Sequence, residues 1–524
     1  MKKYILAAII IIILVFLLFR LSLILLLPAE KLVTLTQDDA FYYMNVALNI
    51  AQGNGVTFDG INQTNGFHPL WQITLIPLYL IIPIDRLLAL RFVLIIQLAV
   101  YSTTFLLLLV LIAKRYSVYS IFPTIITFLF SSYINSLIGG LEAPLQLLIL
   151  TVTIIFLIKY WFNETTIRKD ILLGLLIGLL ILSRLDSIVF LFSFLFFLFL
   201  QTIFRKISFS YFIKHSSIVS ISSFLVIFPF LLWNKINFGH ISTISSYLKS
   251  SFPKILFNPR IIIQYPQWSI FIVITILFLI IILAGKFFQS CRNVIREMSS
   301  SYQKTVIIFC IYVLIHFFFI LLFSRWELAG WYFVPYLLIV PLGLSPIIAA
   351  IKTTLDSSLL KKTVAFLYMI FILLGFSFDI FMQGFSLQHR LGGNGFYEPS
   401  YHSAIWVKNN TPKGAIFATT DCGIFGYFSE RSVIELDGVA NNFEYQEWFL
   451  KKGLNNYLNT KKVTYIRDYA SSTPLNYESK TLSIRSKIKR DFCDSISLTK
   501  KDEIYRSPSF FHLGKNKEQM IWKY

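Results

Sequence analysis

The stretch "TQDDAFYYMNVALNIAQGNG", residues 36–55, follows a long apolar run at the N-terminus and decides how the chain is interpreted. It places two adjacent carboxylates, Asp38 and Asp39, just beyond the first hydrophobic segment, and continues into aromatic residues and a turn rich in Gly and Asn. Two adjacent carboxylates are unusual in a chain that is otherwise poor in charge. The rest of the sequence has to show which environment this acidic pair occupies.

The composition indicates a membrane protein. Of the 524 residues, 56% are hydrophobic and only 14% are charged, and the mean hydropathy is +0.68, outside the usual balance of soluble chains. The net charge of +20 would suit a nucleic-acid partner, but much of it lies in short loops between apolar runs. There it sets membrane orientation, so we expect no nucleic acid to bind.

Apolar segments recur up to residue 382 and predict a helical membrane module. They lie at about 4–27, 67–84, 91–113, 120–138, 145–161, 171–183, 187–204, 217–234, 268–285, 305–323, 331–350 and 363–382. The first segment is too long for a signal-peptide core, and no small-residue cleavage pattern follows it. It is therefore predicted to remain as a membrane anchor.

The composition of the chain changes after residue 382 from apolar segments to a charged tail. The tail carries 20 Lys/Arg and 14 Asp/Glu, and segments such as "GAIFATTD" (414–421) and "RSVIEL" (431–436) are typical of strands. We therefore predict a transmembrane module over 1–382, with a first outer loop at 28–70, and a soluble domain over 383–524. The fold class is a mainly α membrane protein followed by a small α/β domain.

Basic residues set the predicted orientation, because loops rich in Lys and Arg stay in the cytoplasm. All six basic clusters fall on one side only if residues 67–84, interrupted by Pro69, Pro77 and Pro83, are re-entrant or interfacial. This gives eleven spans, a cytoplasmic N-terminus and an extracytoplasmic C-terminal domain in a multi-pass plasma-membrane protein. The clusters are Lys2-Lys3, Lys114-Arg115, Lys159/Arg168/Lys169, Arg205/Lys206/Lys214, Lys286/Arg292/Arg296/Lys304 and Lys352/Lys361/Lys362.

The same orientation gathers the acidic and aromatic motifs on the outer side. They are Asp38, Asp39, Glu142, Arg184, Asp186, the loop 235–267 and Trp326-Glu327. A carboxylate at the bilayer surface, where water is limited, can act as general base towards an acceptor hydroxyl. Adjacent residues on a helix point apart, so one Asp would face the reaction while the other orients a loop or binds a cation with Glu142. A helix cap before "AFYYMNVALNIAQG" is the alternative, and capping is compatible with catalysis.

These motifs resemble a known family. The stretch "DDAFYYMNVALNIAQGNGVTFDGINQTNGFHPLW" (38–71) strongly resembles the first outer loop of GT-C superfamily membrane glycosyltransferases that use polyprenyl-phosphate sugars. Further motifs are similar to the family in the same order: "GGLEAPL" (139–145), "LSRLDS" (182–187), "WNKINFGHISTISSYLKS" (233–250), "WYFVP" (331–335) and "DCGIFGYFSERSVIELDGVANN" (421–442). The resemblance covers most of the chain. It implies a GT-C-like helical module with a site under the first outer loop, followed by an extracytoplasmic domain.

The resemblance also implies roles for the acidic residues. Asp38 stands at the position of the first-loop acid that the family uses as base, and Asp39 stands at its acidic neighbour. Glu142 matches the second-loop acid, which in some members holds a divalent cation or positions the first loop. The metal requirement stays open: no metal site is firmly predicted, and Asp39 with Glu142 are the candidate ligands for Mg²⁺ or Mn²⁺.

Further residues are candidate substrate contacts, each with a structural alternative. His68 stands before Pro69 where several family members carry Lys, so it is either a phosphate contact or a structural residue. Arg184 and Asp186 form either a functional pair or a mutually neutralising one. Lys249 is either a phosphate partner or a solvated loop residue.

Aromatic residues and cysteines complete the set. Trp331 and Tyr332 would stack on a sugar, or else belong to the aromatic belt at the membrane interface. Cys422 and Cys493 both fall on the outer side and could form a disulfide.

The predicted function is an inverting glycosyl transfer. A polyprenyl-phosphate monosaccharide would give its hexosyl or pentosyl group to an extracytoplasmic hydroxyl on a glycan, lipid or protein, with Asp38 as base. No nucleotide-binding signature is needed, since the sugar is already on a membrane lipid. A lipid-linked sugar flippase or transporter is the alternative, but the sequence lacks repeat symmetry and concentrates its acids on one face. A non-catalytic scaffold would leave the first loop unexplained.

Overall fold

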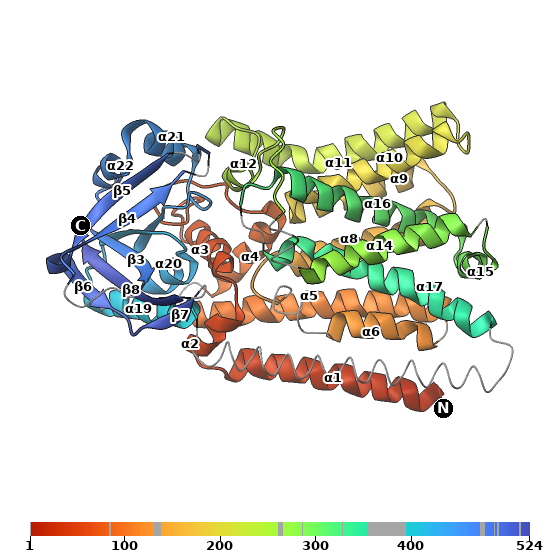
Figure 1. The fold of residues 1–524 in the computed structure, drawn as a ribbon, viewed down its shortest axis with the longest axis horizontal. Helices are drawn as coiled ribbons and strands as arrows, with labels where there is room; N and C mark the ends of the chain where they lie inside the picture. The colour runs from red at the N-terminus through yellow and green to blue at the C-terminus, as the bar shows by residue number, and fades with distance from the viewer. Residues whose placement is uncertain are drawn as a thin grey trace.

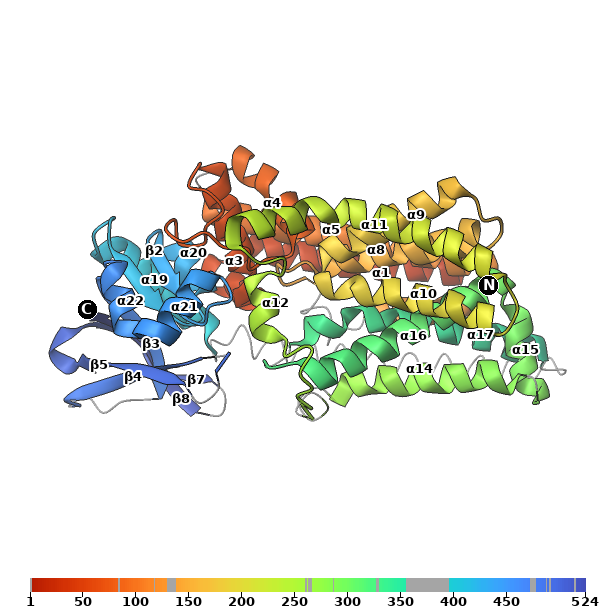
Figure 2. The same cartoon turned by 90° about the horizontal axis from the view of Figure 1, so that it is seen from above.

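The protein consists of a helical bundle with a small mixed domain at one end (Figure 1, Figure 2). This computed structural model describes residues 2–82, 85–116, 118–129, 138–259, 262, 266–285, 287–326, 329–354, 395–471, 477–486, 488–489, 492–512 and 515–524. The long helices run side by side, and the C-terminus lies in the domain, far from the N-terminus at the other end of the bundle. The predicted fold class, a mainly α membrane protein with a small α/β domain, is confirmed.

The bundle contains most of the apolar segments that the sequence predicts. Its helices are α1 (Lys2–Leu26), α4 (Pro69–Ile81), α5 (Arg86–Arg115), η2 (Val118–Ile121), α6 (Phe122–Leu129), α8 (Ala143–Phe156), η3 (Leu157–Trp161), α9 (Ile167–Ser183), η4 (Leu185–Ser187), α10 (Ile188–Ile203), α11 (Phe209–Phe238), α14 (Pro266–Ala284), α15 (Gln289–Glu297), α16 (Ser300–Phe323), η5 (Gly330–Leu338) and α17 (Ile339–Thr354). Among the described residues, six helical stretches are long and apolar enough to cross a membrane, and the bent pair α14 and α15 would make a seventh. The predicted span at 363–382 lies outside the described residues.

The two apolar segments nearest the N-terminus form the helices α1 and α4. At the end of α1, Arg91 of α5 donates hydrogen bonds to the carbonyls of Ile24 and Leu27 at 2.6 and 2.9 Å, which a helix C-terminus leaves without partners. The segment predicted at 67–84 forms α4, which has Pro69 in its first turn and only 13 residues. A membrane span needs roughly 20 residues.

The first loop, residues 28–70, contains α2 (Ala29–Leu32), η1 (Val33–Leu35) and α3 (Asp38–Ala51), followed by an irregular turn before α4. Asn45 Nδ2 donates to Phe58 O at 2.6 Å. Asn49 Nδ2 donates to Thr57 O at 2.9 Å and to Phe58 O at 3.1 Å. Buried carbonyls need hydrogen-bond donors, and the Asn side chains of α3 supply them to the turn. This role explains why Asn recurs in the sequence just before the turn.

The C-terminal domain packs helices on a mixed sheet of order β2-β1-β3-β8-β6, with β7 also paired to β8. Strand β1 runs parallel to β2 and β3, and β8 is antiparallel to its neighbours. A second, two-stranded antiparallel sheet pairs β4 with β5. The elements are α19 (Tyr397–Asn410), β1 (Ile416–Thr419), α20 (Gly423–Ser429), β2 (Ser432–Glu435), α21 (Phe443–Lys452), α22 (Leu454–Thr460), β3 (Tyr465–Ser471), β4 (Ser479–Arg485), β5 (Cys493–Thr499), η6 (Lys500–Asp502), β6 (Glu503–Arg506), β7 (Phe510–His512) and β8 (Lys515–Lys523).

The hydrophobic core continues from the bundle into the C-terminal domain. One cluster of buried side chains contains Phe41 of α3, Trp71 of α4 and Leu108 of α5, together with Ile424 and Phe425 of α20. The domain is therefore packed against the first loop. The boundary predicted at residues 382 and 383 lies outside the described residues.

The cysteine pair considered for a disulfide is not bonded. Cys422 and Cys493 are both free. Cys422 is buried in the core beside α20, whereas Cys493 is exposed on β5. Their different environments explain why the two thiols are not bonded to each other.

We predict that Asn49→Ala destabilises the first loop. The substitution removes the donor that serves Thr57 O, while Phe58 O keeps its hydrogen bond from Asn45, and an unsatisfied buried carbonyl costs about 1–3 kcal/mol. Thermal unfolding in detergent should show the loss as a lower Tm. Asn54→Ala is the matched control, since the Asn54 side chain makes only 3.4 Å contacts, with Asn49 and Gln52, in the same turn. Equal losses in the two variants would contradict this role of Asn49.

Candidate functional site

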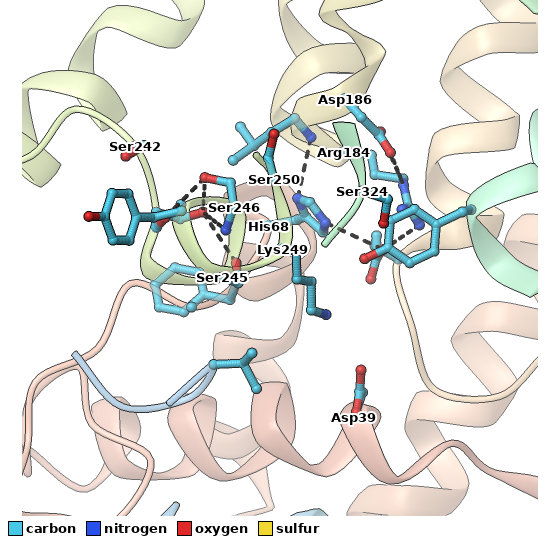
Figure 3. Close-up of a pocket in the computed structure, with 18 of the residues that line it drawn as sticks. Asp39, His68, Arg184, Asp186, Ser242, Ser245, Ser246, Lys249, Ser250 and Ser324 are labelled. Carbon is cyan, nitrogen blue, oxygen red and sulfur yellow. Dashed lines mark hydrogen bonds and ion pairs between the residues drawn. The ribbon is translucent and has the colours of Figure 1, made fainter. Parts of the chain in front are cut away.

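A cavity of about 770 Å³ lies where the first loop, the bundle and the C-terminal domain meet (Figure 3). Its polar wall comes from α3, from α12 (Ile244–Lys249) and from the segment after α16. Its apolar wall includes Phe192 of α10 and Phe319 of α16, and the C-terminal domain contributes Val439 and Ala440. The volume lies within the range of small-molecule sites, about 300–1,000 Å³.

The two adjacent acids at the start of α3 point in different directions, since consecutive residues on a helix are rotated by about 100°. Asp39 lines the cavity and Asp38 does not. Asp38 instead accepts hydrogen bonds from the backbone N–H groups of Gly423 at 2.9 Å and Ile424 at 2.8 Å, at the start of α20. The residue expected as base therefore faces the C-terminal domain, and its neighbour faces the cavity.

Local helix capping does not account for the acidic pair. The N-cap residue of α3 is Gln37, whose side chain makes no capping hydrogen bond, and both Asp residues lie inside the first turn. Asp38 caps a different helix, α20, from a distant part of the chain. The pair thus stabilises a tertiary contact on one side and supplies an acid to the cavity on the other.

Burial raises the pKa of both carboxyls. The pKa of Asp38 rises to about 7, because burial outweighs the hydrogen bonds from Ile424 and Gly423. The pKa of Asp39 also rises through burial, and the Lys249 ammonium offsets part of the shift. A raised pKa suits proton transfer near neutral pH, but a base must also reach the substrate. Of the two acids, Asp39 has this access.

Glu142, Arg184 and Asp186 form a buried ion cluster on the cavity wall. Arg184 Nη1 lies 3.0 Å from Glu142 Oε1, and Arg184 Nε lies 3.1 Å from both carboxylate oxygens of Asp186. Arg184 is 1% exposed and Glu142 is 2% exposed. Buried charges at this depth require partners, so mutual neutralisation and a place in the site occur together. The structure brings together three residues that the sequence predicted.

The loop before α8 is fixed beside α3. Gly140 N donates to Gln97 Oε1 at 2.7 Å, and Trp71 Nε1 donates to Gly140 O at 3.0 Å. Gly140 has a φ of +93°, and a Cβ at this position would lie 2.4 Å from Ala40 Cβ. Only glycine permits this backbone conformation and this approach, which carries Glu142 to the cavity.

His68 contacts the same cluster as a neutral imidazole. The Leu185 N–H donates to Nδ1 at 3.3 Å, so the ring proton is on Nε2, which lies 3.6 Å from Glu142 Oε1. Burial lowers the pKa of His68, and Glu142 offsets only part of that shift. His68 is therefore a neutral hydrogen-bonding group at the position where the family resemblance places a lysine cation.

Sequence reasoning does not single out His316, which lies inside α16 and is fully buried. Its Nδ1 lies 2.8 Å from Tyr336 Oη, and its Nε2 lies 3.4 Å from Asp186 Oδ2. The available signal is a histidine within the apolar run 305–323, because readily charged residues in membrane spans commonly mark function.

Lys249 and Arg325 bring two further cations to the cavity wall. A short antiparallel bridge between Ser250 and Ser324 joins the end of α12 to the end of α16. Across it, Arg325 N donates to Lys249 O at 2.8 Å. Arg325 is not among the site residues that the sequence predicts. The sequence feature that could have indicated it is its position just after an apolar run, on the side where basic residues are scarce.

The charge of Lys249 is retained in this environment. Burial alone lowers its pKa, but the neighbouring Tyr332 and Asp39 more than offset that effect, so the pKa is raised. The Lys249 side chain extends from α12 towards Asp39 on α3 (Figure 3). Within the described ranges, neither Lys249 nor Arg325 forms an ion pair with a carboxylate. Both cations are therefore available to an anionic ligand.

Trp331 and Tyr332 lie in η5 and line the cavity, as a sugar-binding role requires. The Tyr332 ring centre lies 4.2 Å from the Arg184 guanidinium carbon, a cation–π distance. Trp331 O accepts a hydrogen bond from Arg184 Nη1 at 3.4 Å. Glu327, expected on the same side, lies outside the described residues.

The candidate metal ligands fit a divalent cation poorly. In the part of the chain that the structure describes, no group of three or more His, Cys, Asp or Glu side chains is placed to hold a metal ion. Glu142 Oε1 already pairs with Arg184 and lies beside His68. A hard cation needs several free oxygen ligands, and the Arg184 charge would repel it.

Known proteins match this chain mainly in structure. Residues 392–505 match a family model described as a domain of unknown function (DUF8728). No curated protein matches the chain in sequence. The family model covers α20 and the segment that carries Val439 and Ala440.

Solved structures share the overall fold. The archaeal oligosaccharyltransferase AglB from Archaeoglobus fulgidus, in complex with an inhibitory peptide and a dolichol-phosphate, is 12% identical; the match covers 89% of this chain and 69% of AglB at a TM-score of 0.56. ArnT from Cupriavidus metallidurans, bound to undecaprenyl phosphate, is 9% identical; the match covers 94% of this chain and 97% of ArnT at a TM-score of 0.54. Both are GT-C glycosyltransferases, and the GT-C fold predicted from the sequence is confirmed.

We predict that His68→Asn reduces the acid sensitivity of the folded protein. The pKa of His68 is lower in the folded state than its usual value of about 6.5, so its contribution to stability is complete above about pH 6.5 and is lost at lower pH. Asn keeps an acceptor for the Leu185 N–H but does not titrate.

Thermal unfolding between about pH 7.5 and pH 5 measures this effect, which amounts to about 1.4 kcal/mol for each unit by which the pKa is lowered. The variant should lose less stability over this range than the parent protein. His402→Asn, at an exposed position on α19, serves as control. Parallel pH profiles for the parent protein and His68→Asn would show that folding does not lower the pKa of His68.

Proposed function

We propose that this protein is an integral-membrane glycosyltransferase that moves a monosaccharide from a polyprenyl phosphate to an acceptor hydroxyl. One observation carries the proposal: a single cavity combines the acid Asp39, the cations Lys249 and Arg325, which pair with no carboxylate among the described residues, and an apolar wall. The GT-C fold supports it. The complexes of AglB with dolichol-phosphate and of ArnT with undecaprenyl phosphate make a lipid phosphate the ligand class to test first.

The apolar wall suits an isoprenoid tail. It is formed by side chains of α10 and α16, among them Ile188, Phe192, Ile315 and Phe319. Phe192 is 56% exposed and Ile315 is 38% exposed at the surface of the bundle. The wall thus continues to the surface that would contact acyl chains, where burial of each CH₂ of the tail contributes about 0.8 kcal/mol.

The donor phosphate would bind at Lys249 and Arg325. The planar guanidinium of Arg325 can donate two parallel hydrogen bonds to phosphate oxygens, while Lys249 acts as a compact charge. The hydroxyls of Ser250 and Ser324 lie on the same cavity wall. This arrangement would stabilise the charge that grows on the phosphate as it leaves.

We propose Asp39, rather than Asp38, as the general base. Its carboxylate takes the proton of the acceptor hydroxyl while the acceptor oxygen attacks the anomeric carbon of the sugar. The bond from that carbon to the phosphate oxygen breaks, and its electron pair leaves with the lipid phosphate. Attack from the face opposite the phosphate inverts the anomeric configuration.

The remaining site residues would orient the reactants. The cluster of Glu142, Arg184 and Asp186 holds Tyr332 in place through the stacked guanidinium. Trp331 and Tyr332 would then present aromatic faces to the sugar. Because Arg184 pairs with Glu142, no step of the proposed reaction uses a divalent cation.

We propose that the cavity faces the outside of the plasma membrane and that the N-terminus is cytoplasmic. The connection between α10 and α11, which carries Arg205 and Lys206, lies at the bundle end opposite the C-terminal domain (Figure 1). Basic loops stay in the cytoplasm, which puts the domain and the cavity on the other side. The acceptor is then an extracytoplasmic glycan, lipid or protein.

The test is a panel of radiolabelled polyprenyl-phosphate sugars incubated with the purified protein and membranes. We predict that Asp39→Asn lowers transfer by about 10²–10⁴-fold, because the acceptor proton loses its base. Asp85→Asn is the control, since Asp85 caps α5 and does not line the cavity. Label transfer by Asp39→Asn at the parental rate would remove Asp39 as base. Movement of intact donor across the bilayer, without transfer, would favour a flippase.

We also predict that Lys249→Met and Arg325→Met weaken binding of the lipid phosphate. Each substitution removes a charged hydrogen-bond donor worth about 1.5–3 kcal/mol, or about 10–150-fold in affinity. Inhibition of transfer by added undecaprenyl phosphate gives the readout, with Lys254→Met in the same loop as control. Lys254 is exposed and lies outside the cavity. Unchanged inhibition in the first two variants would place the phosphate elsewhere.

A further inference from the structure

The C-terminal domain holds the first loop through the backbone of α20. Both carboxylate oxygens of Asp38 accept hydrogen bonds from α20, one from Gly423 N at 2.9 Å and one from Ile424 N at 2.8 Å. Tyr42, one turn further along α3, accepts a hydrogen bond from Cys422 N through its hydroxyl at 3.2 Å. Three consecutive backbone N–H groups of the domain thus bind side chains of one helix face.

The contact is too close for any residue other than glycine at position 423. A Cβ on Gly423 would lie 2.0 Å from Asp38 O, a distance that real structures do not show. A Cβ on Gly426 would lie 2.6 Å from Phe58 Cζ, in the turn that follows α3. The two glycines of "DCGIFGYF" (421–428) therefore allow α20 to approach the first loop.

Aromatic packing makes the contact continuous. The Phe41 ring lies 5.5 Å from the Tyr427 ring and 5.6 Å from the Phe428 ring. Tyr427 Oη lies 2.8 Å from Tyr79 Oη of α4 and donates to Arg86 O of α5 at 3.0 Å. All of these rings are buried. One short helix of the domain therefore joins α3, α4 and α5.

We propose that the C-terminal domain is a positioning part of the active site, in which α20 grips Asp38 and thereby sets the direction of Asp39. Asp38 and Asp39 are neighbours in the first turn of α3, so the rotation that aligns Asp38 with α20 also fixes which way Asp39 points. Asp38 is a positioning residue. The effect on catalysis rests on the proposed function, whereas the grip itself does not.

The domain also supplies part of the cavity wall. Val439 and Ala440, which line it, follow β2 in the same domain. A Cβ on Gly66 of the first loop would lie 1.9 Å from Val439 O, so loop and domain meet closely here as well. Displacement of α20 would thus move one wall of the cavity along with α3.

Two variants of the full-length protein in detergent test the proposal. Gly423→Ala pushes α20 away from Asp38 O, and Asp38→Asn replaces one acceptor oxygen with an NH₂ group that faces a backbone N–H. Gly414→Ala is the matched control, because a Cβ there meets nothing within 4 Å. Thermal unfolding shows whether each variant is folded. If one of the two variants does not fold, the measurements on the other variant test the proposal.

Hydrogen exchange measures the grip directly, without any substrate. Both variants should exchange faster than the parent protein at the backbone amides of the first turn of α3 and of α20, and Gly414→Ala should not. Unchanged exchange at these amides would overturn the proposal.

Kinetics measures the consequence for catalysis. A displaced Asp39 should lower kcat by about a hundredfold, since a shift of about 1 Å can have that effect. Binding of undecaprenyl phosphate should stay within about twofold of the parent protein, because Lys249 and Arg325 lie on other elements. Faster exchange with an unchanged kcat, or equal losses of binding and kcat, would overturn the positioning role. If the parent protein consumes no donor, the proposed function fails and the exchange result alone decides whether α20 grips α3.

Discussion

The site depends on one buried guanidinium. Arg184 lies between Glu142, from the loop before α8, and Asp186 of η4, and its guanidinium lies over the Tyr332 ring of η5. Removing a buried partner from such a cluster commonly costs about 3–5 kcal/mol, so these segments hold one another in register. His68 joins the cluster as a neutral group, which adds a contact without adding a charge that would need a further partner.

The first turn of α3 connects this cluster to the C-terminal domain. Helical geometry sends Asp38 and Asp39 to different surroundings: one binds α20, and the other faces the cavity. A pair of acids at this position can therefore both bind α20 and supply a carboxylate to the cavity, which one acid could not. The same geometry answers why a chain poor in charge keeps two carboxylates together at the end of its first apolar segment.

The sequence predicts the membrane module, the small α/β domain and the convergence of Glu142, Arg184 and Asp186, because hydropathy and ordered motifs report on these directly. It does not reveal which of Asp38 and Asp39 faces the cavity, since that depends on a backbone contact with residue 423, far along the chain. His316 and Arg325 were also missed. A single His or Arg in or beside an apolar run does not indicate a site by itself. Only the packing shows that His316 lies beside Asp186 and that Arg325 lies beside Lys249.

Charge balance ties the base to the phosphate site. Apart from the neutral His68, the described cavity wall carries three carboxylates, Asp39, Glu142 and Asp186, and three cations, Arg184, Lys249 and Arg325. A sugar phosphodiester adds one negative charge, and transfer converts it to a monoester that gains a second charge as Asp39 gains the acceptor proton. The total charge of the cavity then stays constant, so no uncompensated charge forms beside its buried wall residues. Had the acid that receives the proton faced only α20, the negative charge gained by the phosphate and the negative charge lost by the acid would arise in separate places, and the loss would not offset the gain.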